Sequence, residues 1–230
     1  MLILSLDSAA TVASVALVRD ETVLGEYTLN AGNTHSVTLL PMIEHLLKMT
    51  GKKIEDIDLF AISEGPGSFT GVRIGAACIK GLAFQYDKPC VGVSTLEALA
   101  YNLRGFGGII CPCMNARRDQ VYTALFRDGD YPVRLTDDMA ISVSELSEML
   151  SGYENVYFCG DGYFLVSHLS DFKTPDRLCL QSGVSVAAVA KRKYDLCEDR
   201  SVFTSDSLAP TYLRKPQAER EREERLKNEN

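Results

Sequence analysis

The sequence predicts an α/β protein of two lobes, each built from three strands, a helix, a strand and a helix. Three observations support this prediction. Short apolar runs separated by tight turns open the chain, two long segments of helical pattern follow, and the same order begins again after a glycine-rich joint at 105–108. We therefore expect a first lobe at 1–104, a second lobe at 105–215 and a charged tail at 216–230.

The elements of the first copy follow from the apolar period and from the residues that end each run. Short apolar runs bounded by polar turns predict strands, whereas a 3.6-residue apolar period predicts helices. The expected order is strands at 2–6, 12–18 and 23–29, a helix at 35–49, a strand at 59–62 and a helix at 70–84, followed by a strand at 91–93 and a helix that ends near 102–108.

The second copy repeats that order. We expect strands at 109–114, 120–126 and 133–135, a helix at 143–150, a strand at 156–159 and a glycine turn into a helix, then an extended segment at 178–180 and a helix at 184–194. A duplicated unit of this kind is the architecture of actin-like ATPases, in which nucleotide lies between the lobes. Fold analogy alone does not establish activity.

Composition excludes several classes of protein. The 230 residues are 46% hydrophobic, which is enough for a large core, and the net charge of −7 argues against an extensive phosphate-binding surface on this chain by itself. No apolar run approaches the roughly 18 residues that span a bilayer, and Asp7 comes too early for a signal peptide. Seven scattered cysteines are typical of reduced core thiols, so we place the chain in the cytoplasm.

Two polar breaks are candidate anion-binding sites. Asp7 and Ser8 end the first predicted strand, where actin-like and sugar-kinase-like ATPases hold metal-bound phosphate. Gly160 and Gly162 form the other glycine turn of the second copy, and Asn115 stands where a full ATPase commonly has an acidic residue. In the alternative interpretation, Asp7 and Ser8 only bond the amides of their own turn.

A glycine-rich turn, GPGSFTGVRIG at 65–75, joins a predicted buried strand to a helix. Gly65 and Gly67 permit positive φ angles or close approach to a neighbour, and Ser68 or Thr70 can cap the helix. A turn of this kind is also an anion-binding geometry. It lacks the lysine and the following Ser/Thr of a Walker loop, and its spacing is not that of a dinucleotide fingerprint. The structural and the anion-binding interpretations both stay open.

Two helices are more apolar than a surface helix requires. About half the circumference of the helix at 35–49 is apolar, whereas a surface helix needs a stripe of roughly 100°. The helix at 70–84 carries only Arg73 and Lys80 as charges, and it has two glycines on one face, which suggests a closely packed neighbour. Each helix is either wedged between a sheet and another helix or used at a protein interface.

The histidines do not predict a metal site. Two imidazoles on a helix reach one ion when they are three or four residues apart, whereas His35 and His45 are ten residues apart. We interpret His35 as a helix-capping or interface residue and His45 as a solvated one.

Five blocks of sequence together resemble the bacterial TsaB family, also called YeaZ. They occur in the family's order over nearly the whole chain: LSLDSAATVASVAL near the start, HSVTLLPMI at 35–43, GPGSFTGVRIG at 65–75, MNARRDQVY at 114–122 and PTYLR at 210–214. The resemblance implies a two-lobed actin-like fold with no enzymatic activity of its own and no cofactor.

The resemblance also implies partners. TsaB-like proteins pair with TsaD, the related subunit that transfers the threonylcarbamoyl group to the adenosine beside the anticodon of certain tRNAs, and the ATPase TsaE joins the complex. A homodimer through the same surface is implied when TsaD is missing, and tRNA is reached through the complex. In TsaD a helix carries two metal-binding histidines four residues apart. Here Leu39 takes the place of the second one after His35, so the metal chemistry is absent.

In this family the first-lobe helices contact the partner, and the two unusually apolar helices lie there. The predicted contact residues are Leu39, Met42, Ile43, Leu46, Gly71, Arg73, Gly75 and Cys78, although the sequence does not say which of them face the lobe's own core. A bulky residue at Gly75 is expected to abolish partner binding and leave the fold intact. The hypothesis is a non-catalytic subunit that supports a TsaD-like transferase. The alternative is a small actin-like phosphotransferase that uses Asp7 and the two glycine turns around MgATP.

Overall fold

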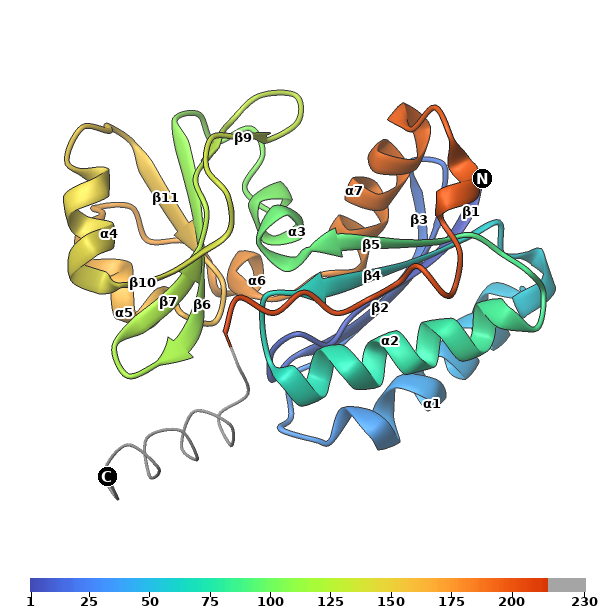
Figure 1. Ribbon diagram of the computed structural model, residues 1–230. Coiled ribbons are helices and arrows are strands. Elements are labelled where there is room, and N and C mark those ends of the chain that lie inside the picture. Colours follow the sequence, from blue (N-terminus) through green and yellow to red (C-terminus); the bar gives the residue numbers. More distant parts are fainter. Residues whose placement is uncertain (215–230) are drawn as a thin grey trace, which may run out of the picture.

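The computed structural model describes residues 1–214, which form two lobes side by side (Figure 1). Each lobe contains one β-sheet with helices packed against it, as the α/β prediction required. Among the described residues, no helix is long and apolar enough to cross a bilayer. The predicted charged tail at 216–230 lies outside the described part of the chain.

The first sheet has five strands in the order β3-β2-β1-β4-β5. Its central strand β1 pairs antiparallel with β2 and parallel with β4. Tight turns therefore join β1 to β2 and β2 to β3, and a crossover connection leads from β3 to β4. The strands are β1 (Leu2–Asp7), β2 (Ala13–Arg19), β3 (Thr22–Leu29), β4 (Leu59–Gly65) and β5 (Cys90–Ser94). All five were expected from the apolar runs.

Two long helices, α1 (His35–Thr50) and α2 (Phe69–Phe84), cover one face of this sheet, and α7 (Gly183–Leu196) covers the other (Figure 1). Side chains alternate along β1, so Leu4 packs in the cluster that includes α1 and α2, whereas Ile3 packs in the cluster that includes α7. Helix α2 begins with one of its two predicted caps, because the Ser68 hydroxyl accepts a hydrogen bond from the Gly71 amide at 3.3 Å.

The second sheet repeats the order of the first four strands of the first sheet, with interrupted strands. Its members are β6 (Ile109–Arg117), β7 (Gln120–Thr123), β8 (Phe126–Arg127), β9 (Val133–Arg134), β10 (Met139–Ser142) and β11 (Val156–Cys159). Moving four residues along β6, from Cys113 to Ile109, moves its partner four residues, from Thr123 to Arg127. Strands β7 and β8 are therefore two parts of the predicted strand at 120–126. The parallel neighbour of β6 is β11, in the place that β4 takes beside β1.

Two predictions for the second lobe were incomplete or wrong. The third strand was expected at 133–135 only, but it continues as β10, which pairs with β7. It is interrupted because the Leu125 amide bonds the Thr136 hydroxyl instead of a backbone carbonyl. The segment at 178–180 was expected to be extended, but its start belongs to a short helix. The helices around this sheet are α4 (Val143–Leu150), α5 (Tyr163–Val166) and α6 (Asp176–Cys179), and short 3-10 turns occur at Ile54–Asp56, Ser167–Leu169 and Arg200–Val202.

The two halves of the chain exchange helices. Helix α3 (Thr95–Tyr101) follows the first sheet in sequence, but its Leu99 and Ala100 share an apolar cluster with the second sheet. Helix α7 comes from the second half, and its Val186 and Ala190 pack on the first sheet. The expected boundary at 104/105 therefore separates the two sheets, but the range 105–215 includes a helix that belongs in space to the first lobe.

Candidate partner interface

The glycine-rich turn after β4 is held by contacts within the chain. Gly65 has a φ of +120°, and a Cβ there would overlap the Thr211 carbonyl oxygen. A Cβ at Gly67 would overlap the Ala9 carbonyl, to which the Ser68 amide donates a hydrogen bond at 2.6 Å. Close approach of two backbone segments explains these glycines, so the contacts support the structural interpretation of the turn.

Asp7 and Ser8 are buried where β1 ends. The Asp7 carboxylate accepts hydrogen bonds from the Ala9 amide at 2.8 Å and from the Ser63 hydroxyl. Burial raises the pKa of Asp7 from 3.8 to about 6, although these two hydrogen bonds favour the charged form. The Ser8 hydroxyl donates to the Gly71 carbonyl oxygen at 2.9 Å. Both side chains are thus engaged inside the first lobe.

The other candidate anion turn is packed against β6. Gly160 has a φ of +96°, and a Cβ there would overlap the Cys113 carbonyl oxygen. The Gly162 amide donates to that same carbonyl at 2.9 Å. Between them, the Asp161 carboxylate accepts a hydrogen bond from the Asn115 amide at 3.0 Å. Gly160 and Gly162 are therefore required by the approach of this turn to the strand.

An apolar cluster joins the two lobes. It includes Ala9 and Val72 from the first lobe, Leu99 from α3, and Met114 and Phe126 from the second sheet, all at most 2% exposed. Burying one of the larger side chains of this cluster contributes about 1.5–3 kcal/mol. The lobes are therefore held together by a shared core at the position of α3.

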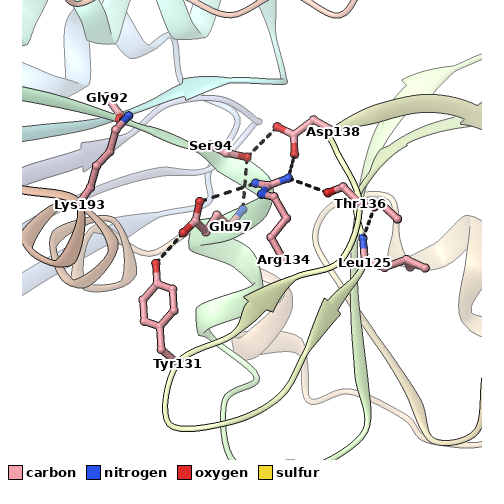
Figure 2. A network of polar contacts seen from close by, with 9 residues as sticks. All are labelled: Gly92, Ser94, Glu97, Leu125, Tyr131, Arg134, Thr136, Asp138 and Lys193. Carbon is pink, nitrogen blue, oxygen red and sulfur yellow. Dashed lines mark hydrogen bonds and ion pairs between the residues drawn. The ribbon is translucent and has the colours of Figure 1, made fainter. Parts of the chain in front are cut away.

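A polar network joins the lobes at the start of α3 (Figure 2). The Ser94 hydroxyl donates to Asp138 at 2.8 Å, and Asp138 also pairs with Arg134. Arg134 lies 3.7 Å from Glu97, which accepts a hydrogen bond from the Tyr131 hydroxyl at 2.7 Å. Ser94 and Glu97 come from the first half of the chain, and the other three residues come from the second. Each partly exposed ion pair contributes about 1 kcal/mol or less.

The residues after α7 form a C-terminal strap (residues 208–214) that crosses from the first lobe to the second (Figure 1). Leu208 is buried in the core of the first lobe, and the Thr211 amide donates to the Glu64 carbonyl at 2.7 Å. At the far end, the Arg214 guanidinium donates to the Ala116 carbonyl at 3.3 Å. The strap is thus a third connection between the lobes.

Three of the predicted partner contacts on α1 face the lobe's own core. Leu39, Ile43 and Leu46 are each 2% exposed and pack against the first sheet. They lie at the centre of the broad apolar arc of α1, which is the part that a sheet covers. Assigning them to the partner surface was wrong, because a partner cannot reach them while the lobe is folded.

The two predicted glycine contacts on α2 also face inward. A Cβ at Gly71 would overlap the Ser8 carbonyl oxygen, and a Cβ at Gly75 would overlap the Ser8 hydroxyl and lie 2.9 Å from Ile62. The prediction that α2 has a close neighbour was right, but the neighbour is the end of β1. A bulky residue at Gly75 would therefore disturb the lobe itself, contrary to our expectation of an intact fold.

The other predicted contacts are accessible. Arg73 is exposed, and Met42 and Cys78 are partly buried at the edge of the core. Burial raises the pKa of the Cys78 thiol to about 11, so this side chain is a neutral apolar group at physiological pH. Met42 lines a groove of about 340 Å³ between α1 and the edge strand β3, beside His45 and Tyr27, whose rings stack at 5.3 Å.

Several exposed apolar residues on these helices were missed as contacts. Val37, Leu40 and Met49 of α1 and Phe84 of α2 are 66%, 53%, 67% and 76% exposed. Leu40 and Met49 lie at the two edges of the apolar arc whose centre is buried. The sequence contained this signal. A sheet covers only part of so broad an apolar arc, and the edges of the arc therefore stay exposed.

His35, the first residue of α1, is part of the core. Its Nε2 lies 2.7 Å from the Ala10 carbonyl oxygen, and its Nδ1 has no hydrogen-bond partner among the described residues. Leu39, one turn further along α1, is buried in apolar surroundings. Within residues 1–214, no group of three or more His, Cys, Asp or Glu side chains is placed to hold a metal ion.

Repeated sheets, exchanged helices and a junction at α3 define the class of protein as the two-lobed, actin-like ATPase fold. Comparisons with known proteins agree. A family model described as TsaD, tRNA N6-adenosine threonylcarbamoyltransferase, matches residues 23–221. The structure of YeaZ from Pseudomonas aeruginosa superimposes with a TM-score of 0.78 at 24% identity, covering 92% of this chain and 99% of that chain.

Sequence relatives narrow the assignment. The tRNA threonylcarbamoyladenosine biosynthesis protein TsaB of Bacillus subtilis (strain 168) is 32% identical over 225 residues, which are 95% of this chain and 96% of the relative. TsaB of Escherichia coli (strain K12) is 38% identical over 129 residues, which are 55% of each chain. The chain belongs to the TsaD-type family and, within it, to the TsaB (YeaZ) proteins of tRNA threonylcarbamoyladenosine biosynthesis.

Proposed function

We propose that this chain is a non-catalytic subunit that binds a TsaD-like transferase through the outer face of α1 and α2 and supports the threonylcarbamoylation of tRNA. The observation that carries the proposal is the apolar character of this face, where Val37, Leu40, Met49 and Phe84 are each more than half exposed. Removing one such side chain from water contributes about 1.5–3 kcal/mol. A partner that covers these residues therefore gains substantial binding free energy.

The shape of α2 supports close docking of a partner. Its exposed positions include Ala77 and Gly81, whose small size leaves room for a neighbouring element beside Phe84. A Cβ added at Gly81 would meet no atom within 4 Å, so this part of the helix is open. Small residues beside a large apolar anchor are suited to a partner helix or strand that packs near the backbone.

The family assignment suggests the partners. TsaD-like transferases are relatives of this chain, and we propose one as its main partner, with a TsaE-like ATPase joining the complex. A second copy of the chain would cover the same face when the transferase is missing, and tRNA would be bound by the complex. We propose a cytoplasmic location, because all seven cysteines are free thiols, as in a reducing compartment.

Within residues 1–214, no contact favours the alternative of an ATP-dependent phosphotransferase. Asp7, Ser8 and the amide of Gly162 are engaged within their own lobes.

Reconstitution tests the proposal. A purified TsaD-like subunit is assayed for transfer of the threonylcarbamoyl group to tRNA with and without this chain, and titration calorimetry measures binding of MgATP to the chain alone. We expect transfer to depend on the chain and the chain alone to bind MgATP weakly or not at all. Full transfer without the chain, or phosphotransfer by the chain alone, would contradict the proposal.

A further inference from the structure

Arg73 lies on the exposed face of α2, with its guanidinium group stacked on Phe69 and hydrogen-bonded to Tyr212, whose ring packs against that of Phe69. Its Cζ lies 3.8 Å from the centre of the Phe69 ring and 5.5 Å from that of Tyr212. Its Nε donates a hydrogen bond to the Tyr212 hydroxyl at 2.7 Å. The two rings are 4.6 Å apart and tilted by 31°. Stacking and the Nε hydrogen bond together set the plane and the direction of the guanidinium group.

Tyr212 is itself held in place from both sides. The backbone of Thr211 is anchored to the Glu64 carbonyl, and Arg214 donates to the Ala116 carbonyl on the second lobe. Phe69 precedes Arg73 by four residues on α2, which places the two side chains on one face of the helix. The arginine is therefore preorganised, and little side-chain entropy is lost when it binds a ligand.

The two terminal nitrogens of the Arg73 guanidinium group remain available to a ligand. A guanidinium group has five N–H donors, and one of them, on Nε, is used by Tyr212. Its terminal nitrogens make no hydrogen bond or ion pair to any residue within 1–214, and the side chain is exposed. Two parallel N–H donors in a plane match the two oxygens of a carboxylate.

The charge of helix α2 favours an acidic ligand. Helix α2 contains no Asp or Glu, and its charged residues are Arg73 and Lys80. This positive strip contrasts with the net charge of −7 of the whole chain. A carboxylate that approaches along α2 meets two cations and no anion of that helix, and burial at the interface strengthens the attraction.

We propose that Arg73 is an anchor that binds a carboxylate side chain of the TsaD-like transferase, and that Phe69 and Tyr212 are its positioning residues. The proposal rests on the proposed function, since it specifies chemistry within the same surface. It also gives the C-terminal strap a role in binding, because the strap brings Tyr212 to Arg73 from the far end of the chain.

The test measures the affinity of the full chain for the purified TsaD-like subunit by titration calorimetry at two salt concentrations. We expect Arg73→Ala to weaken binding by about 30-fold or more, because the partner carboxylate loses its charged ligand. Arg73→Lys should recover only part of the loss, since an ammonium group has no planar fork. Arg127→Ala, which removes an exposed arginine of the second lobe, is the matched control and should change affinity by about threefold or less.

A double-mutant cycle tests the positioning role. Tyr212→Phe keeps the ring and removes the hydroxyl that fixes Nε, and we expect it to weaken binding by about fivefold. In the Arg73→Ala background the same change should have no further effect, because the group that it positions is gone. Equal effects in both backgrounds would show that Tyr212 acts only through the fold of the strap and would overturn its assigned role.

Ala77→Arg, which places a bulky charge on the same face, separates this proposal from the proposed function. If Ala77→Arg abolishes binding and Arg73→Ala does not weaken it, the anchor is overturned and the interface stands. If neither variant weakens binding, the interface itself is overturned. If Arg73→Ala leaves the protein complex unchanged but weakens its binding to tRNA, the anion is a phosphate of the nucleic acid and the carboxylate assignment is overturned.

Discussion

The helices on the outer side of the two lobes occupy equivalent places in a repeated unit, but they differ in length and surface. In the first lobe, α1 and α2 have 16 residues each and expose Val37, Leu40 and Phe84. In the second lobe, α4 has eight residues, and its exposed positions are Ser144, Glu145, Ser147 and Glu148. The outer helices of the second lobe therefore expose one large apolar side chain, Phe164 of α5, whereas α1 and α2 expose four. This difference is the reason that we propose the first lobe as the binding lobe.

The largest effect is expected from charge placed on the apolar surface. Ala77→Arg should weaken binding of the TsaD-like subunit by about 1,000-fold, which corresponds to about 4 kcal/mol, because an unpaired charge is buried where small residues allow close packing. Size-exclusion chromatography and calorimetry of the mixed proteins measure it. Ser147→Arg on α4 is the matched control, and a similar loss with that variant would remove the distinction between the lobes.

The inner face of α2 should respond through stability instead of binding. Gly75→Val should destabilise the isolated chain by about 3 kcal/mol or more, because its side chain overlaps Ser8 and meets Ile62 and Leu6. Denaturant unfolding gives the free energy of unfolding. Gly81→Ala on the outer face should leave it unchanged or raise it by up to about 1 kcal/mol, since the helix gains propensity and the position is open. Equal destabilisation by both variants would contradict the assignment of the two faces.

The buried carboxyl group of Asp7 should make the first lobe sensitive to pH. Its pKa is about 6 in the folded protein, above its ordinary value of 3.8, chiefly because of burial. The stabilisation from protonated Asp7 is therefore fully present below about pH 4 and is lost as the pH rises through 6. Asp7→Asn cannot ionise. The free energy of unfolding of the variant minus that of the parent should therefore rise by on the order of 2–3 kcal/mol between pH 4 and 7.

An exposed carboxyl group gives a control of the opposite sign. The hydrogen bond from the N-terminal ammonium group lowers the pKa of Asp20, so its contribution is present above the ordinary pKa and is lost as the pH falls. Asp20→Asn should therefore lose a little stability relative to the parent at neutral pH. If Asp7→Asn also lost stability relative to the parent as the pH rose to neutral, or if the difference did not depend on pH, the buried Asp7 carboxyl would not titrate as described.

The smallest effect is expected where the lobes meet at the polar network. Arg134→Ala removes the partners of Glu97 and Asp138 in one step, and it should lower the free energy of unfolding by about 1 kcal/mol, because these groups are partly exposed. Arg127→Ala, at an exposed position of the same lobe, is the control. A loss of several kcal/mol with Arg134→Ala would show that the network, and not the apolar cluster around Leu99, holds the lobes together.

The sequence predicted the repeated strands because each is a short apolar run between polar turns, and β1 to β5 follow those runs closely. It missed β10 because that strand has only four residues, all partly buried, and its short apolar run directly follows the charged pair Asp137 and Asp138. The local sequence pattern also could not predict which sheet α3 and α7 pack against, since both faces of a buried helix are apolar whichever sheet it meets.

The candidate site was predicted at the level of the helix but not of the residue. The broad apolar arc on α1 includes residues that contact the sheet and residues that are exposed to solvent. We assigned its centre, Leu39 and Ile43, to the partner, but the sheet covers the centre and leaves Leu40 and Met49 at the edges. Arg73 was predicted, whereas its hydrogen bond to Tyr212 joins residues 139 positions apart and has no local signal.

Hydrogen–deuterium exchange of the full chain, with and without the purified TsaD-like subunit, tests the central claim most directly. We predict slower exchange on binding in α1 and α2, with α4 and α5 unchanged, because the partner covers the apolar face of the first lobe. Protection confined to the second lobe, or no protection in either lobe at concentrations where the subunits are bound, would contradict the assignment of this surface.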